Sequence, residues 1–269
     1  MAHMWQIVKA EIVKQHRNTF HSRLMYFSLL VWPIVIFLNA YYNVKPFDLS
    51  QSASVELSTV ESTVTFLITG FLGYNCFWTL VESAWLMSFE RRNGTLEMVF
   101  LSSGNRMAII YGRSLGALFE NIWMFVIFTI FVILFVNGIP LANLVYLPLV
   151  FLVLLLSAMV WGGLMNVIFL FSRDASVFFN LFDEPMVLFA GVRIPTAVFP
   201  AWARVVSVIF PLTHTLVIVR SLLIHGDFMQ SLASFCVVIA VNGVLVAVTS
   251  ILLGLAERHI RRTGNFTFF

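Results

Sequence analysis

Long apolar runs, separated by short polar segments, account for most of this chain. A helix needs about 20 apolar residues to cross the hydrocarbon core of a bilayer. Six segments meet or approach that length: 24–44, 62–89, 107–137, 145–171, 175–191 and 230–256. The fifth is the shortest and is interrupted by Asn180, Asp183, Glu184 and Pro185. The pattern predicts an all-α membrane protein with six transmembrane helices in a single domain over residues 1–269.

The apolar segment 192–226 is broken by three prolines, Pro195, Pro200 and Pro211. Basic residues concentrate in the cytoplasmic segments of membrane proteins. If the N-terminus is cytoplasmic and this segment does not cross, twelve Lys and Arg residues lie inside and four lie outside. A crossing segment would move the arginine cluster at 258–262 to the outside. We therefore predict a re-entrant helical hairpin on the outer face, with both termini cytoplasmic. The expected location is the plasma (inner) membrane of a prokaryote.

The N-terminal segment 4–23 precedes the first apolar run. Trp5, Val8 and Ile12 follow the three-then-four spacing of a helical stripe, and charged residues occupy the other faces. A tryptophan and paired basic residues are typical of helices that lie in the membrane interface. We interpret 4–23 as an interfacial amphipathic helix, with a solvated cap on the first span as the alternative.

The composition is that of a chain whose solvent is lipid. Of its 269 residues, 60% are hydrophobic and 11% are charged, whereas a soluble domain carries about 25% charged residues. The formal net charge of +3 does not suggest a nucleic-acid partner. Cys76 and Cys236 lie inside apolar runs, so neither a disulfide framework nor a metal site is predicted.

A polar segment, 90–104, separates the second and third predicted spans. Gly94 can end the preceding helix, and Glu97 then stands in the first turn of a new helix, where an acid is favourable. Leu96, Val99 and Phe100 would share one face of that helix. The apolar face fits insertion into a soluble partner as well as contact with the lipid surface, and spacing alone favours neither.

The run Glu90-Arg91-x-x-Gly94-Thr95-Leu96-Glu97 resembles the signature that precedes the third span of ABC-2 type permeases. The resemblance implies that 90–104 is a cytoplasmic coupling helix that docks into an ATPase subunit. The residues it places at that contact are Glu90, Arg91, Gly94, Thr95, Leu96, Glu97 and Phe100.

A second motif of the same family matches downstream. It consists of Ala190-Gly191, Pro195, Pro200-Ala201-Trp202, Pro211-Leu212-Thr213-His214 and Arg220. In ABC-2 permeases a similar pattern forms outer re-entrant helices. The resemblance implies this role for Gly191, Pro195, Pro200, Trp202, Pro211, His214 and Arg220.

The sequence contains no Gly-x-x-x-x-Gly-Lys-Ser/Thr phosphate loop. We therefore expect no ATP site and no enzymatic activity in this chain, with ATP and Mg²⁺ bound by a separate ATP-binding cassette ATPase. Six spans enclose a narrow interior, so we expect a second copy or a close paralogue. The expected assembly has two permeases and two ATPases.

Ionisable residues inside a membrane are expensive and are functional candidates. Asp183 and Glu184 fall within the fifth predicted span, beside Phe179 and Phe182. Adjacent helical residues point about 100° apart, so at most one acid faces a pathway. We expect that acid to be Asp183, because Phe179, Asp183 and Met186 form one stripe. Helix packing is the alternative role for these residues.

The expected function is export of an amphipathic, drug-like or lipid- or glycan-linked molecule, driven by the partner ATPase. A secondary transporter is one alternative, although the expected inverted repeat is not seen. An intramembrane hydrolase is another, although the sequence has neither a Gly-x-Ser-x-Gly elbow nor a His-Glu-x-x-His pair.

Overall fold

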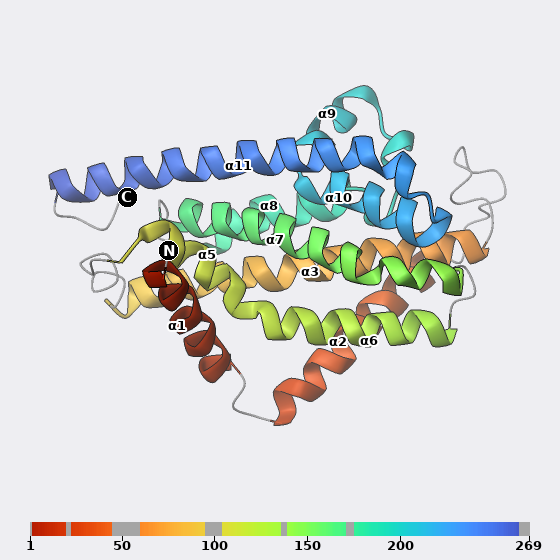
Figure 1. Ribbon diagram of the computed structural model, residues 1–269, viewed down its shortest axis with the longest axis horizontal. Helices are drawn as coiled ribbons and strands as arrows, with labels where there is room; N and C mark the ends of the chain where they lie inside the picture. The colour runs from red at the N-terminus through yellow and green to blue at the C-terminus, as the bar shows by residue number, and fades with distance from the viewer. Residues whose placement is uncertain are drawn as a thin grey trace.

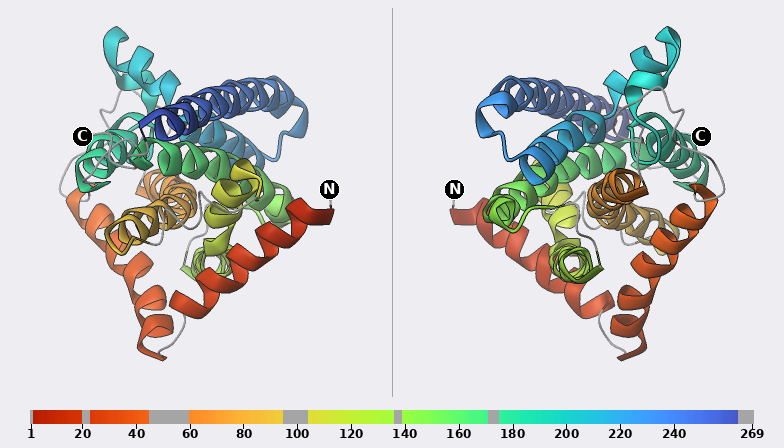
Figure 2. Two further views of the ribbon diagram at one scale, coloured as in Figure 1. Left: turned by 90° about the vertical axis from the view of Figure 1, so that its left-hand side faces the viewer. Right: turned by 90° about the vertical axis from the view of Figure 1, so that its right-hand side faces the viewer.

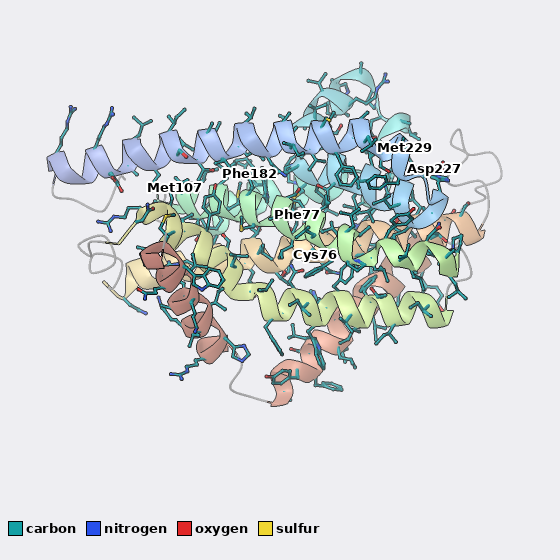
Figure 3. All side chains as sticks on the ribbon, in the orientation of Figure 1. Cys76, Phe77, Met107, Phe182, Asp227 and Met229 are labelled. Atoms are coloured by element: carbon teal, nitrogen blue, oxygen red, sulfur yellow. The ribbon has the colours of Figure 1, made fainter. Side chains whose placement is uncertain are left out.

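Long helices run along the length of the molecule in both directions (Figure 1). Helix α3 (Val60–Arg92) runs from right to left in that view, and α6 (Leu118–Phe135) runs back. Helix α7 (Leu147–Leu170) and the terminal helix α11 (Phe228–Thr263) both end at the left. Met107 lies near that left end, whereas Asp227 and Met229 lie near the opposite one (Figure 3). The predicted runs 62–89, 107–137, 145–171 and 230–256 each coincide with one of these passages.

The computed structural model describes residues 2–19, 23–44, 60–94, 104–135, 139–170 and 175–263, and these contain no strand. The remaining α-helices are α1 (Ala2–Thr19), α2 (Arg23–Val44), α5 (Arg106–Ser114), α8 (Ala175–Phe189), α9 (Ala201–Ile209) and α10 (Pro211–Arg220). Short 3₁₀ turns cover η3 (Leu115–Ala117), η4 (Leu141–Tyr146) and η5 (Thr196–Val198), and a π-helical turn covers η6 (Ser221–His225). The all-helical prediction is confirmed for the described residues.

Four described helical stretches are long and apolar enough to cross a membrane: Ser62–Glu82, Arg106–Ile130, Leu141–Leu170 and Ser231–His259. The bent pair Ala201–Ile209 and Pro211–His225 would make a fifth if it were one span. Helix α2 coincides with the predicted first span, but several of its side chains lie outside the described part of the chain. Helix α8 has 15 residues, about 22 Å at the helical rise. The count of six spans therefore stays a prediction.

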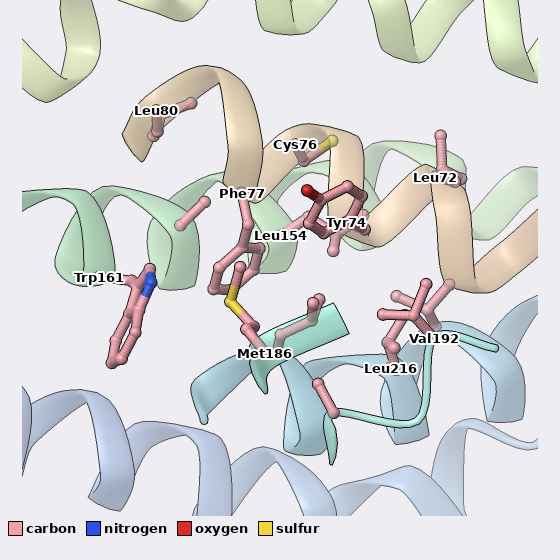
Figure 4. Packing of buried hydrophobic residues seen from close by; sticks show 14 of the residues in the cluster. Leu72, Tyr74, Cys76, Phe77, Leu80, Leu154, Trp161, Met186, Val192 and Leu216 are labelled. Carbon is pink, nitrogen blue, oxygen red and sulfur yellow. The ribbon is translucent and has the colours of Figure 1, made fainter. Parts of the chain in front are cut away.

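Helix α3 is the centre of the bundle. Phe71, Phe77 and Leu80 are fully buried, and they pack against side chains of α7, α8 and α10 (Figure 4). Glycines permit the closest approaches: a Cβ added to Gly70 would lie 2.2 Å from the carbonyl oxygen of Val192. This packing fixes which face of α3 is turned toward α8 and α10.

Buried amides connect the helices of the bundle. The Asn121 Nδ2 on α6 donates 2.8 Å hydrogen bonds to the carbonyl oxygen of Cys76 and to Thr79 Oγ1, both on α3. The Asn166 Nδ2 on α7 reaches Ser114 Oγ on α5 at 3.2 Å. Polar contacts of this kind hold helices together where lipid gives no hydrophobic driving force.

Helix α1 lies across the left end of the bundle rather than along it (Figures 1 and 2). Its Val8 backbone approaches Gly112 of α5 so closely that an added Cβ would meet Val8 Cα at 3.0 Å. Glu11 forms an ion pair at 4.0 Å with Arg113, whose side chain is 1% exposed. Trp5, at 66% exposure, faces away from the protein. This crosswise position is the one expected of an interfacial helix, and that role stays a prediction.

Candidate functional site

The predicted coupling segment begins at the left end of α3. Glu90 and Arg91 belong to the last turn of that helix, and their side chains lie outside the described part of the chain. Gly94 has a φ of +70°, a left-handed conformation that favours glycine at the end of a helix. The prediction that Gly94 ends the preceding helix is confirmed. Thr95, Leu96, Glu97 and Phe100 lie outside the described residues, so the coupling helix itself stays a prediction.

The chain resumes at α5 with a side-chain cap. The Asn105 Oδ1 accepts a 3.2 Å hydrogen bond from the backbone N–H of Ala108, as an N-cap residue does. The next residue, Arg106, forms a 3.7 Å ion pair with Glu257 near the end of α11. The coupling segment therefore begins at the end of α3 and ends at the start of α5. Helix α5 is capped by Asn105 and is joined to α11 through Arg106. Sequence reasoning did not identify the cap, although the Asn105-Arg106 pair before an apolar run is a recognised helix-start signal.

The two acids of α8 have different surroundings. Asp183 is 6% exposed, and its Oδ2 accepts a 3.0 Å hydrogen bond from the hydroxyl of Tyr74 on α3. Its Oδ1 has no hydrogen-bond partner among the described residues. Glu184 is exposed and makes neither a hydrogen bond nor an ion pair within the described part of the chain. The carboxylate on the exposed face of this chain is therefore Glu184, not Asp183, and the pathway role expected of Asp183 stays a prediction.

The rotation of α8 about its axis explains why one acid is buried and the other exposed. Asp183 does share a stripe with Met186, which is fully buried, but that stripe is turned toward α3 and the interior of the protein. Phe182 is half-buried, and its ring meets Trp161 edge-on with centroids 6.1 Å apart. The side chain of Phe179 lies outside the described part. Sequence reasoning also missed Tyr74, for which an isolated hydroxyl in an apolar run was the available signal.

A second set of α8 residues points away from the protein. Its members, which we call the α8 row, are exposed and recur at helical spacing: Val177, Asn180, Leu181, Glu184 and Leu188. Asn180, like Glu184, makes no hydrogen bond among the described residues. Both end-on views place α8 on the same side of the bundle as α2 (Figure 2). One side of the molecule thus presents unpaired polar groups among apolar ones.

The first half of the 192–226 segment turns sharply away from α8. Gly191 is buried and has a φ of +80°, which explains the need for glycine there. Pro195 stands directly before η5, and Pro200 directly before α9, where a residue without a free N–H fits. Trp202 is 65% exposed, and its ring contacts Phe189 edge-on with centroids 5.9 Å apart. These residues direct α9 away from the bundle (Figure 1).

The second half of the segment returns to the bundle. Pro211 is buried at the first position of α10, and α9 and α10 meet at an angle of 93°. Two hydrogen bonds hold this corner: Thr213 Oγ1 donates to the carbonyl oxygen of Ser207 at 2.7 Å, and His214 Nε2 lies 3.1 Å from that of Val208. His214 therefore contributes to the bend itself.

Arg220 ends α10 beside the end of α8. Its guanidinium donates to the carbonyl oxygen of Gly191 at 2.8 Å and to that of Phe66 at 3.3 Å. It also lies over the Phe66 ring, 3.6 Å from the centroid, as in a cation–π contact. The chain leaves α8 after Gly191 and, 29 residues later at Arg220, contacts the end of α8 again. The bent pair α9 and α10 fits a broken span as well as a re-entrant hairpin, so the outer re-entrant role of 192–226 stays a prediction.

Comparison with known protein families agrees with the two motifs. The family model of the ABC-2 type transporter matches residues 2–224, which is most of the chain. The match includes α1, the predicted coupling segment, the α8 row and the hairpin through Arg220. A comparison with curated proteins finds no match. On this evidence the chain belongs to the ABC-2 type transporter family.

Proposed function

We propose that this chain is the membrane-spanning subunit of an ATP-driven exporter that moves an amphipathic, drug-like or lipid- or glycan-linked molecule outward. ABC-2 family proteins are the membrane component of transporters, and a partner subunit hydrolyses the ATP. The substrate, the outward direction and the two-plus-two assembly are parts of the proposal. The charge of α8, the segment 192–226 and the coupling end support it.

The α8 row is the observation that carries the proposal. Glu184 is the tenth residue of α8, so it lies about 14 Å from the start of the helix. A carboxylate facing lipid near the bilayer centre costs at least about 2.5–3.5 kcal/mol. Asn180 adds an unpaired amide one turn away. Protein or water must therefore cover this face. A second copy would shield the α8 row from lipid, and a pathway between the two copies would bring water to it.

The hairpin supports a topology with both termini on one side. Because Arg220 contacts Gly191 directly, residues 192–219 leave and rejoin the same end of the bundle. Helix α11 then makes one more passage and ends at the left end of the bundle, the end across which α1 lies (Figure 1). We infer that this shared end is cytoplasmic, since it carries the N-terminal basic residues and the arginines of α11.

The coupling end lies at the same inferred cytoplasmic face. The segment 90–104 joins α3, the most buried helix, to α5, which is tied to α1 by Glu11–Arg113 and to α11 by Arg106–Glu257. A force applied there by an ATPase acts directly on α3 and α5, and through these ion pairs it reaches α1 and α11. Chains of contacts of this kind carry energetic coupling between distant sites.

Purification of the tagged chain from its own cells, in a mild detergent, tests the proposal. We expect a native mass that fits two copies of this chain and two copies of an ATPase with a phosphate loop. We also expect ATP hydrolysis in the purified complex. A chain that remains alone under several mild detergents, with no hydrolysis, would contradict the exporter and favour a secondary transporter.

A further inference from the structure

The aromatic residues that face α8 form a stripe on α3. Phe71, Tyr74 and Trp78 are spaced three and four residues apart, so they share one side of the helix. The Tyr74 and Trp78 rings lie 6.1 Å apart. One cation of the chain already uses this stripe, because the Arg193 guanidinium lies over the Phe71 ring at 5.8 Å from the centroid. Phe71 and Tyr74 are buried, so the half-buried Trp78 is the member of the α3 stripe that a ligand can reach.

The acids of α8 lie beside the same stripe. Helices α3 and α8 run in opposite directions (Figure 1), and Tyr74 donates its hydroxyl to Asp183. Glu184, the next residue after Asp183, therefore lies at about the level of Tyr74. Trp78, one turn further along α3, is at the level of Asn180, one turn back on α8. Along α3 the order is therefore Arg193 over Phe71, then Glu184 at the level of Tyr74, then Trp78.

Several hydrogen-bond acceptors gather on the α8 row. Glu184 offers a carboxylate and Asn180 an amide oxygen, and neither has a partner among the described residues. Pro185 has no N–H to donate to the carbonyl of Leu181, which belongs to the same row. Leu181 and Leu188, at 58% and 50% exposure, supply apolar surface on either side of the acid. The row combines negative charge, acceptors and apolar area.

Two-fold symmetry argues against a second copy as the direct partner of Glu184. An isologous contact places the same patch on both sides. Two α8 rows that meet across such an axis bring Glu184 toward Glu184, and like charges in an apolar setting repel. A positive charge held between or beside the two carboxylates removes that repulsion. Charge complementarity therefore favours a cation, rather than α8 of a second copy, as the direct partner of the Glu184 carboxylate.

We propose that Glu184 binds the positive charge of a monovalent cationic amphiphile, whose apolar groups lie on Leu181, Leu188 and the exposed part of Trp78. Asp183 acts as a positioning residue, since its hydrogen bond with Tyr74 fixes the rotation of α8. This inference rests on the exporter proposed above and names its substrate class. Arg193, beyond Glu184, opposes the cation and limits how far along the surface it binds.

Tetraphenylphosphonium and tetraphenylborate, which have the same shape and opposite charge, separate charge recognition from apolar binding. Saturable binding of each labelled ion is measured on the purified complex by equilibrium dialysis. We expect wild-type protein to bind tetraphenylphosphonium saturably and tetraphenylborate not at all. Glu184→Gln should weaken that binding at least tenfold, and Arg193→Gln should strengthen it a few-fold. The control Asp227→Asn removes an exposed acid outside the α8 row and should change nothing.

Three results would overturn the inference. These are unchanged tetraphenylphosphonium binding in Glu184→Gln, equal saturable binding of both ions, and loss of the two-copy assembly in Glu184→Gln, which would make the acid a contact between copies. ATP hydrolysis by the same preparation is recorded in parallel. Cation binding without any ATPase would refute the exporter while leaving the site intact, so the two proposals fail separately.

Discussion

The guanidinium of Arg220 donates a 2.8 Å hydrogen bond to the carbonyl oxygen of Gly191, across 29 residues of sequence. A backbone carbonyl at a left-handed glycine has no helical partner of its own, and the arginine supplies one. The same guanidinium reaches α3 through Phe66 and Thr69. One side chain thereby joins the end of α8, the end of α10 and the first turns of α3.

Replacement of Arg220 by Gln should loosen that junction. Hydrogen bonds from charged groups contribute roughly 1.5–3 kcal/mol each, and glutamine loses both the charge and the contact with the Phe66 ring. We expect a loss of about 2–3 kcal/mol, measured as a lower thermal midpoint in detergent. Arg204→Gln is the matched control, because Arg204 is exposed on α9, and its effect should stay within about 0.5 kcal/mol. Equal midpoints for the two variants would refute the structural role of Arg220.

Glycine substitutions test the packing of α3 against the turn after α8. An alanine at Gly70 places its Cβ 2.2 Å from the Val192 carbonyl oxygen and 3.1 Å from the Arg220 guanidinium. Overpacking of this kind costs typically 1–3 kcal/mol. Gly243 on α11 has open space at the same position, so Gly243→Ala should be neutral or slightly stabilising. Thermal unfolding of both variants checks this, and a neutral Gly70→Ala would mean that the turn lies elsewhere.

Cysteine labelling tests the hairpin. Val198 and Asp227 stand near the start and just past the end of the hairpin, and both are exposed, as are Lys9 and Arg258 near the opposite end of the bundle. In a Cys236→Ser background, a membrane-impermeant maleimide on intact cells should label Val198→Cys and Asp227→Cys only. The other two positions should label after permeabilisation. If Val198→Cys and Asp227→Cys react from opposite sides, residues 192–226 cross the membrane and the topology is wrong.

The coupling segment can be tested through Glu97, although its structure lies outside the described residues. Glu97→Arg reverses a charge at the surface expected to meet the ATPase, and such a change weakens a matched contact. We expect permease-dependent ATP hydrolysis to fall about tenfold, which corresponds to about 1.4 kcal/mol. Arg262→Glu reverses a charge at the same end outside the segment and serves as the control. Wild-type hydrolysis in Glu97→Arg would exclude the docking role.

Apolar length and glycine position were sufficient to predict most helices. The run 24–44 coincides with α2, and 230–256 lies within α11, because hydropathy reports directly on the stretch that lipid must cover. The 3₁₀ turn η3 inside the predicted span 107–137 was not predictable. It depends on how α5 packs against α1 and α7, and no local residue pattern signals that packing.

The rotation of α8 about its axis could not be predicted from the sequence either. Spacing correctly grouped Asp183 with Met186, but it does not say whether a stripe faces inward or outward. Tyr74, 109 residues earlier in the chain, decides this by its hydrogen bond to Asp183. The Arg220–Gly191 contact is of the same kind, since motif order predicted a hairpin but not the bond that closes it.

The central claim is that ATP hydrolysis by a separate subunit drives export along a pathway that the α8 row lines. If so, the access of water to Glu184 changes during the ATPase cycle, and labelling of Glu184→Cys tests this without a known substrate. The experiment uses inside-out vesicles of the complex in a Cys236→Ser background and an impermeant thiol reagent. The account predicts that ATP with vanadate changes the labelling rate at this position several-fold. It also predicts no change when the phosphate-loop lysine of the ATPase is replaced. Labelling at one rate with and without nucleotide, in a complex that hydrolyses ATP, would contradict the account.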